Sequence, residues 1–160
     1  MRFSRILFLM MSGMLFFHPA QAKAPAPPRN TDKDSRLIRL QQFFQRYNCP
    51  IRRLAPSFLR ASDSNGIDWR LLPSLALVES GCGKESVRNN IFGWGNGSIP
   101  FRSVEHGIQI VADRLANGEY YRGKSTRQKL YTYNPRPGYV DRVQSVMREL
   151  APNRFAMVAD

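Results

Sequence analysis

Apolar residues recur along most of this chain at three- and four-residue spacing, which is the period of one helix face. The first such face covers residues 37–47. The second covers residues 51–59 and is followed by Gly66, a residue suited to terminate a helix. This spacing predicts a mainly α fold.

The most apolar segment, residues 71–78, predicts a buried central helix because it has no polar face. Asp68 is suited to cap the start of this helix, and Gly81 is suited to end it. Pro73 lies inside the segment, so we expect it to disturb the first turn or two.

The second half of the chain predicts three more helices, over residues 103–118, 126–131 and 139–150. Residues 81–97 are rich in glycine and asparagine, which indicates a loop. Residues 99–102 predict a short extended piece. At most a small β-hairpin is therefore expected beside the helices.

The first 22 residues have the order of a secretory signal peptide. Arg2 and Arg5 precede an apolar run, and a small-x-small pattern ends at Ala22, where we expect cleavage. The run is about a dozen residues, shorter than the roughly 20 of a membrane helix, although an uncleaved anchor is the alternative. After cleavage we predict no integral membrane segment and a periplasmic or secreted protein.

The rest of the chain is predicted to divide into three parts. Residues 23–33 hold prolines among polar residues, which is typical of an extended leader. Residues 34–152 form the predicted domain, large enough for a single core. Residues 153–160 are expected to be a loose tail. We expect the domain to act as a monomer.

The formal net charge is +12, and loss of Arg2 and Arg5 with the signal peptide leaves +10. Strongly basic domains are attracted to polyanions such as nucleic acid, anionic lipid or an acidic cell envelope. Export argues against nucleic acid, so the envelope is the expected partner. A solvated basic surface without a specific partner is the alternative.

Two cysteines, Cys49 and Cys82, remain in an exported chain, which predicts one disulfide. A free buried thiol at Cys82 is the alternative. His106 is the only histidine after the signal peptide, and the cysteine spacing matches no zinc motif. We therefore predict no metal site and no cofactor.

Glu79 is the leading catalytic candidate, because it lies at the C-terminal end of the apolar helix. Partial desolvation there raises a carboxyl pKa, and the negative end of the helix dipole acts in the same direction. A carboxylic acid that stays protonated near neutral pH can donate a proton to a glycosidic oxygen. The alternative is a carboxylate facing water at a frayed helix end.

The segment Val78-Glu79-Ser80-Gly81-Cys82-Gly83-Lys84, followed by Asn89-Asn90-Ile91-Phe92-Gly93-Trp94, resembles the signature of bacterial glucosaminidases of the flagellar-muramidase type. That family carries Glu-Ser-Gly-aromatic-Gly and then Asn-x-Phe-Gly. The Glu-Ser pair also resembles soluble lytic transglycosylases and goose-type lysozymes, which share a lysozyme-like helical fold. The resemblance covers roughly residues 66–148 and includes the stretches 101–103 and 137–143.

This resemblance implies that Glu79 is the general acid and that Tyr139 lines the cleft. It also implies that Asn90, Phe92 and Gly93 form the cleft floor. Cys82 stands where the family has an aromatic residue, so the local packing differs.

The glucosaminidases often have a second carboxylate on a flexible hairpin, and no motif assigns one here. Glu85, Glu105 and Glu119 are the candidates. Without a second carboxylate, the resemblance favours a transglycosylase route. In that route one residue serves as acid and then as base, and the sugar's own hydroxyl closes a ring.

Aromatic rings in or beside the loops suit the flat faces of sugars. Ordinary packing is the alternative for Phe92 and Tyr131. These aromatic residues are Trp94, Tyr131, Tyr133 and Tyr139.

Four basic side chains can bind the carboxylates of peptide stems, and plain surface charge is the alternative. They are Arg122, Lys124, Arg136 and Arg142.

We therefore expect an endo-β-N-acetylglucosaminidase-like enzyme that cuts peptidoglycan glycan strands with Glu79 as acid. The alternatives are a lytic transglycosylase, a non-catalytic peptidoglycan-binding protein and a cationic envelope-disrupting protein. The predicted substrate-binding residues are Ser80, Asn90, Phe92, Gly93, Trp94, Tyr133 and Tyr139.

Overall fold

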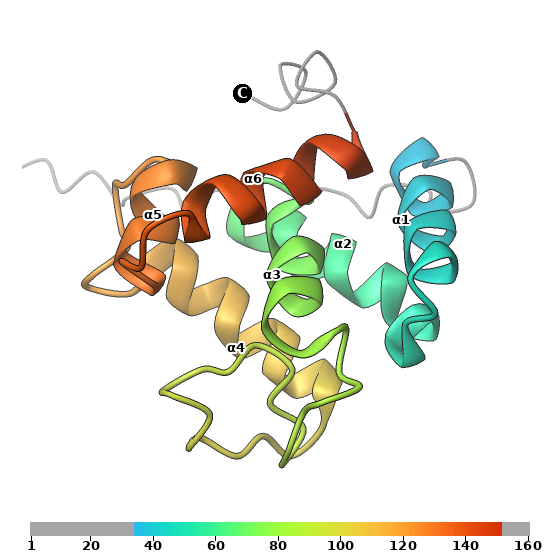
Figure 1. Ribbon diagram of the computed structural model, residues 1–160, viewed down its shortest axis with the longest axis horizontal. Coiled ribbons are helices and arrows are strands. Elements are labelled where there is room, and N and C mark those ends of the chain that lie inside the picture. The colour runs from blue at the N-terminus through green and yellow to red at the C-terminus, as the bar shows by residue number, and fades with distance from the viewer. Residues whose placement is uncertain (1–33, 152–160) are drawn as a thin grey trace, which may run out of the picture.

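The computed structural model describes residues 34–151, and every regular element in that range is helical (Figure 1). The predicted mainly α fold is confirmed, and the optional hairpin is absent from the described residues. The predicted signal peptide, leader and tail lie outside them. The elements are α1 (Ser35–Arg46), the 3-10 helix η2 (Pro50–Leu54), α2 (Ala55–Asn65), α3 (Leu71–Ser80), α4 (Val104–Asn117), α5 (Thr126–Tyr133) and α6 (Tyr139–Leu150).

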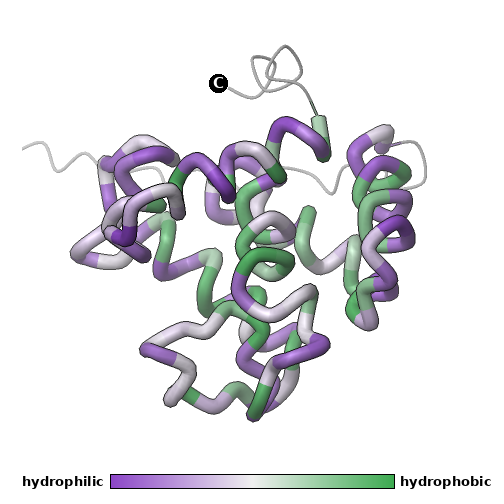
Figure 2. The backbone as a smooth tube through the Cα atoms, viewed as in Figure 1, coloured by the Kyte–Doolittle hydropathy of each residue, from purple (hydrophilic) through white to green (hydrophobic). Residues whose placement is uncertain are grey.

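Helix α3 lies at the centre of the fold, as its composition predicts (Figure 1). Its first six residues, 71–76, are all buried. Helix α6 packs against α3, α4 packs against α2, and α1 and α5 pack on α2 and α6 respectively. The hydropathy colouring shows the apolar stretch along α3, with mixed colouring on the surrounding helices (Figure 2).

Helix α3 begins at Leu71, whereas a cap at Asp68 would start the helix at residue 69. The Asp68 carboxylate accepts from the backbone N–H of Arg70 at 2.9 Å, and the N–H of Leu71 donates to the Asp68 carbonyl at 2.9 Å. These bonds form a turn ahead of the helix. Pro73 consequently lies in the first turn, where a backbone N–H has no partner within the helix. The expected disturbance is therefore absent.

The second predicted helix is divided in two. Pro50 opens η2, and α2 starts at Ala55 with Pro56 in its first turn, where the missing N–H costs least. Gly66 ends α2 in the left-handed region at φ +62°, as predicted.

A disulfide joins Cys49 to Cys82, with the two Cα atoms 5.2 Å apart. It connects the turn after α1 to the loop after α3. Lys84 adds a second link between the same segments, because its Nζ donates to the carbonyl of Tyr47 at 2.8 Å. The loop that follows Glu79 is thereby anchored to the N-terminal part of the domain.

Within residues 34–151, no helix combines the length and apolar character needed to cross a membrane. The same residues contain no group of three histidine, cysteine or acidic side chains placed to hold a metal ion.

Candidate active site

Glu79 lies in the last turn of α3, partly buried beside the start of α6. Tyr139, the first residue of α6, is 4% exposed, and its hydroxyl donates a hydrogen bond to Oε1 of Glu79. Gly138, at φ +77°, turns the chain into α6 just before this tyrosine. The packing of α6 on α3 therefore fixes one oxygen of the carboxyl group.

Burial raises the pKa of Glu79 above 4.5, and this effect outweighs two opposing ones. The hydrogen bond from Tyr139 and the positive charge of Arg142 both favour the ionised form and lower the pKa. The net result is a carboxyl group that keeps its proton to a higher pH than an ordinary glutamate does. This is the property required of a general acid.

The backbone at Gly93 lies against the other carboxyl oxygen. A Cβ placed on Gly93 would be 3.1 Å from Oε2 of Glu79, and the residue has a φ of +60°. Both conditions favour glycine, because a side chain would crowd the carboxyl group and strain the backbone. Gly93 therefore lies directly against the Glu79 carboxyl group.

Asn90 builds the loop that carries Trp94. Its Nδ2 donates to the carbonyls of Trp94 at 2.9 Å and Ile99 at 3.0 Å, and its Oδ1 accepts from the N–H of Trp94 at 2.9 Å. The side chain is 3% exposed, so its polar atoms are all used inside the protein. Asn90 thus positions the loop and has no free group for a substrate.

Ser80 and Phe92 are also buried. The Ser80 hydroxyl donates to the carbonyl of Ile91 at 2.7 Å and accepts from the N–H of Gly83 at 2.9 Å. Phe92 is fully buried in the core, with its ring centroid 6.4 Å from that of Phe58. The prediction that Ser80, Asn90 and Phe92 touch substrate is corrected: their side chains are enclosed and shape the loop.

A row of aromatic rings leads away from the acid. Tyr139 and Tyr133 are stacked with centroids 6.2 Å apart, and Tyr133 meets Trp94 edge-on at 5.6 Å. The row continues to Tyr121, whose centroid is 5.9 Å from that of Trp94. The Tyr133 hydroxyl donates to the carbonyl of Phe92, which ties the row to the loop. The row therefore contains three of the predicted aromatic residues, of which Tyr139 is buried and Trp94 and Tyr133 are partly exposed.

Tyr121 is not among the candidate residues that the sequence predicts, and the structure places it in the turn after α4. The ammonium group of Lys129 holds that turn, since it donates to the carbonyl of Leu115 at 2.6 Å and to that of Tyr121 at 2.9 Å. The only feature of the sequence that could have pointed to Tyr121 is the pair Tyr120-Tyr121 just before a short helix. Tyr131, by contrast, is 63% exposed and takes no part in the row.

None of the three candidate second carboxylates contributes to the pKa of Glu79. Glu105 accepts from the Ser57 hydroxyl and forms an ion pair with Arg60 at 3.3 Å, and so faces α2. Glu85 and Glu119 are exposed. Among the described residues, the charge that acts on Glu79 is that of Arg142.

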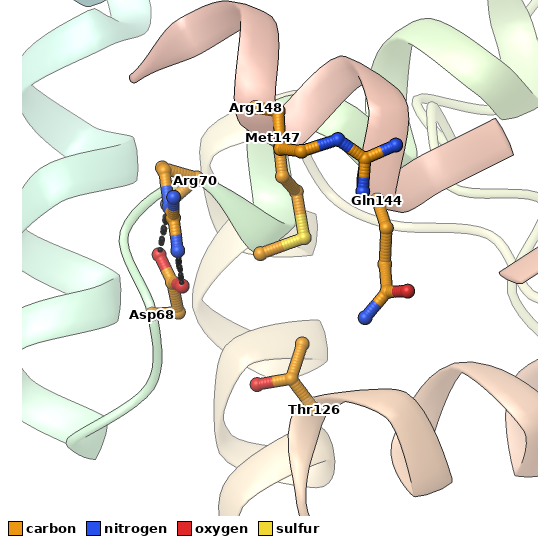
Figure 3. Close-up of a pocket in the computed structure, with 6 residues that line it drawn as sticks. All are labelled: Asp68, Arg70, Thr126, Gln144, Met147 and Arg148. Atoms are coloured by element: carbon orange, nitrogen blue, oxygen red, sulfur yellow. Dashed lines mark hydrogen bonds and ion pairs between the residues drawn. The ribbon is translucent and has the colours of Figure 1, made fainter. Parts of the chain in front are cut away.

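Two surface depressions lie apart from Glu79. The first, about 180 Å³, is shown in Figure 3. An ion pair between Arg70 and Asp68 at 2.6 Å forms one of its walls, and Arg70 also donates to the carbonyl of Ala151 at 2.9 Å. The second, about 350 Å³, is lined by residues of α5, the preceding loop and the start of α6.

The chain matches no family model, and no curated protein or solved structure is significantly similar to it. The features that bear on its function are those around Glu79: a partly buried carboxyl group, a hydrogen-bonded tyrosine, a close glycine backbone and a row of aromatic rings. In this arrangement the ring of Trp94 is partly exposed, and a carboxyl group whose pKa is raised can donate a proton.

Proposed function

We propose that this protein cleaves the glycan strands of peptidoglycan, with Glu79 as the general acid. The observation that carries the proposal is the state of Glu79: burial raises its pKa, and one oxygen is held by Tyr139. A protonated, oriented carboxyl group is what departure of a glycosidic oxygen requires.

The aromatic row supports a sugar ligand. Trp94 is partly exposed, and its ring lies between those of Tyr121 and Tyr133. Rings of this kind offer flat apolar faces to the C–H patches of sugars and polar edges to their hydroxyls. A polymer placed along the row would bring a glycosidic bond toward Glu79.

The likeness of the Glu79 and Asn90–Trp94 segments to glucosaminidase and transglycosylase signatures supports the same reaction class. The predicted signal peptide and the net charge of +10 that remains after its removal fit an enzyme that acts on an acidic envelope.

The surroundings of Glu79 favour the single-acid route over two-carboxylate hydrolysis. No acidic side chain of the described residues contributes to the pKa of Glu79. In the single-acid route, Glu79 first protonates the leaving oxygen. The resulting carboxylate then takes the proton of the sugar's own hydroxyl as that oxygen closes the ring, so no second acid is needed.

The test is mass spectrometry of fragments released from purified peptidoglycan by the mature protein. Glu79→Gln should abolish release and leave the fold intact, whereas the control Glu85→Gln should retain it. Anhydro-muramyl ends support the single-acid route, and reducing N-acetylglucosamine ends support a glucosaminidase.

Other outcomes would overturn the proposal. Binding to sacculi without release of fragments indicates a non-catalytic wall-binding protein. Envelope disruption that survives Glu79→Gln and collapses with added salt indicates a charge-driven effect.

A further inference from the structure

The corner formed by α5 and α6 has two sides with different chemistry. Tyr133 and Tyr139 lie in the aromatic row that leads to Glu79. The 350 Å³ depression lies on the other side of α5, and its volume falls within the roughly 300–1,000 Å³ of small-molecule sites. It is lined by Lys124, Arg127, Gln128, Tyr131, Thr132 and Val140.

Helix periodicity explains why residues of α5 and α6 line both the aromatic row and the depression. On α5, Leu130 and Tyr133 are three residues apart and face inward, whereas Gln128, Tyr131 and Thr132 occupy the outer face. At the start of α6, Val140 directly follows Tyr139 and points to the depression. A ligand bound along the aromatic row at Trp94 and Tyr133 could therefore reach the depression by passing around this corner.

The depression combines apolar surface with the positive charges of Lys124 and Arg127. Tyr131 is a large ring left 63% exposed, and Val140 adds an aliphatic wall. Lys124 donates to the neutral Thr132 hydroxyl at 2.8 Å. The ligand that matches this surface has small apolar groups and carboxylates.

Arg127 donates to the neutral amide of Gln144 at 3.0 Å and pairs with Asp141 at 3.3 Å. Both members of that ion pair are well exposed, so water and salt weaken it. Its guanidinium can therefore turn to a ligand carboxylate at small cost. In the smaller depression of Figure 3, by contrast, the buried Arg70 forms an ion pair with Asp68 and donates a hydrogen bond to the carbonyl of Ala151.

We propose that the α5–α6 depression binds the short, carboxylate-bearing peptide stems attached to the glycan strand. The proposal rests on the proposed function, since the stem is carried by the sugar polymer cut at Glu79. Stem carboxylates bind Lys124 and Arg127, and a small aliphatic side chain packs on Tyr131 and Val140. The enzyme thereby prefers strands that still carry their peptides.

The test compares the wild type with Lys124→Met/Arg127→Met, which removes the two charges and keeps an aliphatic side chain at each position. The substrates are intact peptidoglycan and glycan strands stripped of peptide by an amidase. We expect KM on intact strands to rise about tenfold, with KM on stripped strands unchanged. Arg52→Met/Arg53→Met removes the same charge from the exposed surface of η2 and should behave as wild type.

A second readout does not depend on catalysis. Titration of the free stem tetrapeptide into the wild type should perturb NMR signals of Tyr131 and Val140, and the double variant should lose this response. An equal loss of activity on both substrates, unchanged kinetics, or loss of binding only to anionic lipid vesicles would overturn the proposal. If the wild type cuts neither substrate, the glycan-cleavage proposal fails, and the titration alone decides the peptide site.

Discussion

The hydroxyl of Tyr139 donates a hydrogen bond to Oε1 of Glu79, and this bond joins the first residue of α6 to the last turn of α3. It stabilises the carboxylate, so it lowers the pKa of Glu79, whereas burial raises it by more. Tyr139 therefore both orients the acid and limits how far its pKa rises.

Replacement of Tyr139 by Phe removes the hydrogen bond and keeps the ring. The pKa of Glu79 then rises further, so its protonated, active form persists to higher pH. We expect the alkaline limb of the kcat/KM profile to move upward. The rate at the optimum should fall about tenfold, because the carboxyl group loses its fixed orientation. The measurement is kcat/KM against pH.

Two comparisons make the Tyr139 result specific. Arg142→Gln should move the same limb in the same direction but by less, because an exposed charge is screened. Tyr120→Phe changes a ring that is 71% exposed and should leave the profile unchanged. A limb that stays in place or moves downward in Tyr139→Phe contradicts the assigned role.

Gly93 should tolerate no side chain. Alanine there would place Cβ 3.1 Å from Oε2 of Glu79 at a φ of +60°. Gly97→Ala is the matched control, since Gly97 has a φ of +76° in the same loop with nothing within 4 Å. Each variant should lose about 1–2 kcal/mol of stability from backbone strain. Only Gly93→Ala should also lose most of its kcat, and equal activities would show that the contact is unimportant.

The sequence predicts the helices and the partly buried position of Glu79 better than it predicts the loop that follows. Glu79 was found because it ends an almost wholly apolar helix, a local pattern that needs no knowledge of packing. Asn90 was assigned to the cleft floor by the resemblance alone, and only the folded chain shows its amide enclosed by three backbone groups. Tyr121 was missed because its contact with Trp94 depends on how the turn after α4 folds back.

Asn90→Asp tests the positioning role of that amide. The substitution removes both Nδ2 donors and turns a carboxylate oxygen toward the carbonyls of Trp94 and Ile99. We expect a loss of about 1–3 kcal/mol in the free energy of unfolding. Trp94 fluorescence should shift toward that of an exposed ring, measured in a Trp69→Phe background. Asn96→Asp introduces the same charge at an exposed position of the loop and should do neither.

The disulfide should stabilise the domain substantially. Cys49 and Cys82 are 33 residues apart, and closing a loop of that length contributes about 3–4 kcal/mol on the loop-entropy treatment. Cys49→Ala/Cys82→Ala should lose that amount in urea unfolding, and a reductant should then have no further effect on it. A loss below about 1 kcal/mol would show that the link to the loop after Glu79 is not a major source of stability.

Stability measured against pH provides a test of Glu79 that needs no substrate. Because its pKa in the folded state lies above 4.5, the folded protein binds more protons than the unfolded chain between those two values. Its stabilising contribution is therefore complete below pH 4.5 and is lost as the pH rises through the folded-state pKa. Glutamine has the same shape and no charge, and its Oε1 can still accept from Tyr139.

Glu79→Gln should consequently have a higher melting temperature than the wild type at pH 7, and this difference should shrink as the pH is lowered toward 4.5. The other titrating groups are common to both proteins, so they cancel in the comparison. Glu85→Gln, at an exposed position, should track the wild type throughout. A Glu79→Gln protein that is less stable at pH 7, or a difference that does not vary with pH, would mean that burial does not control the protonation of this carboxyl group.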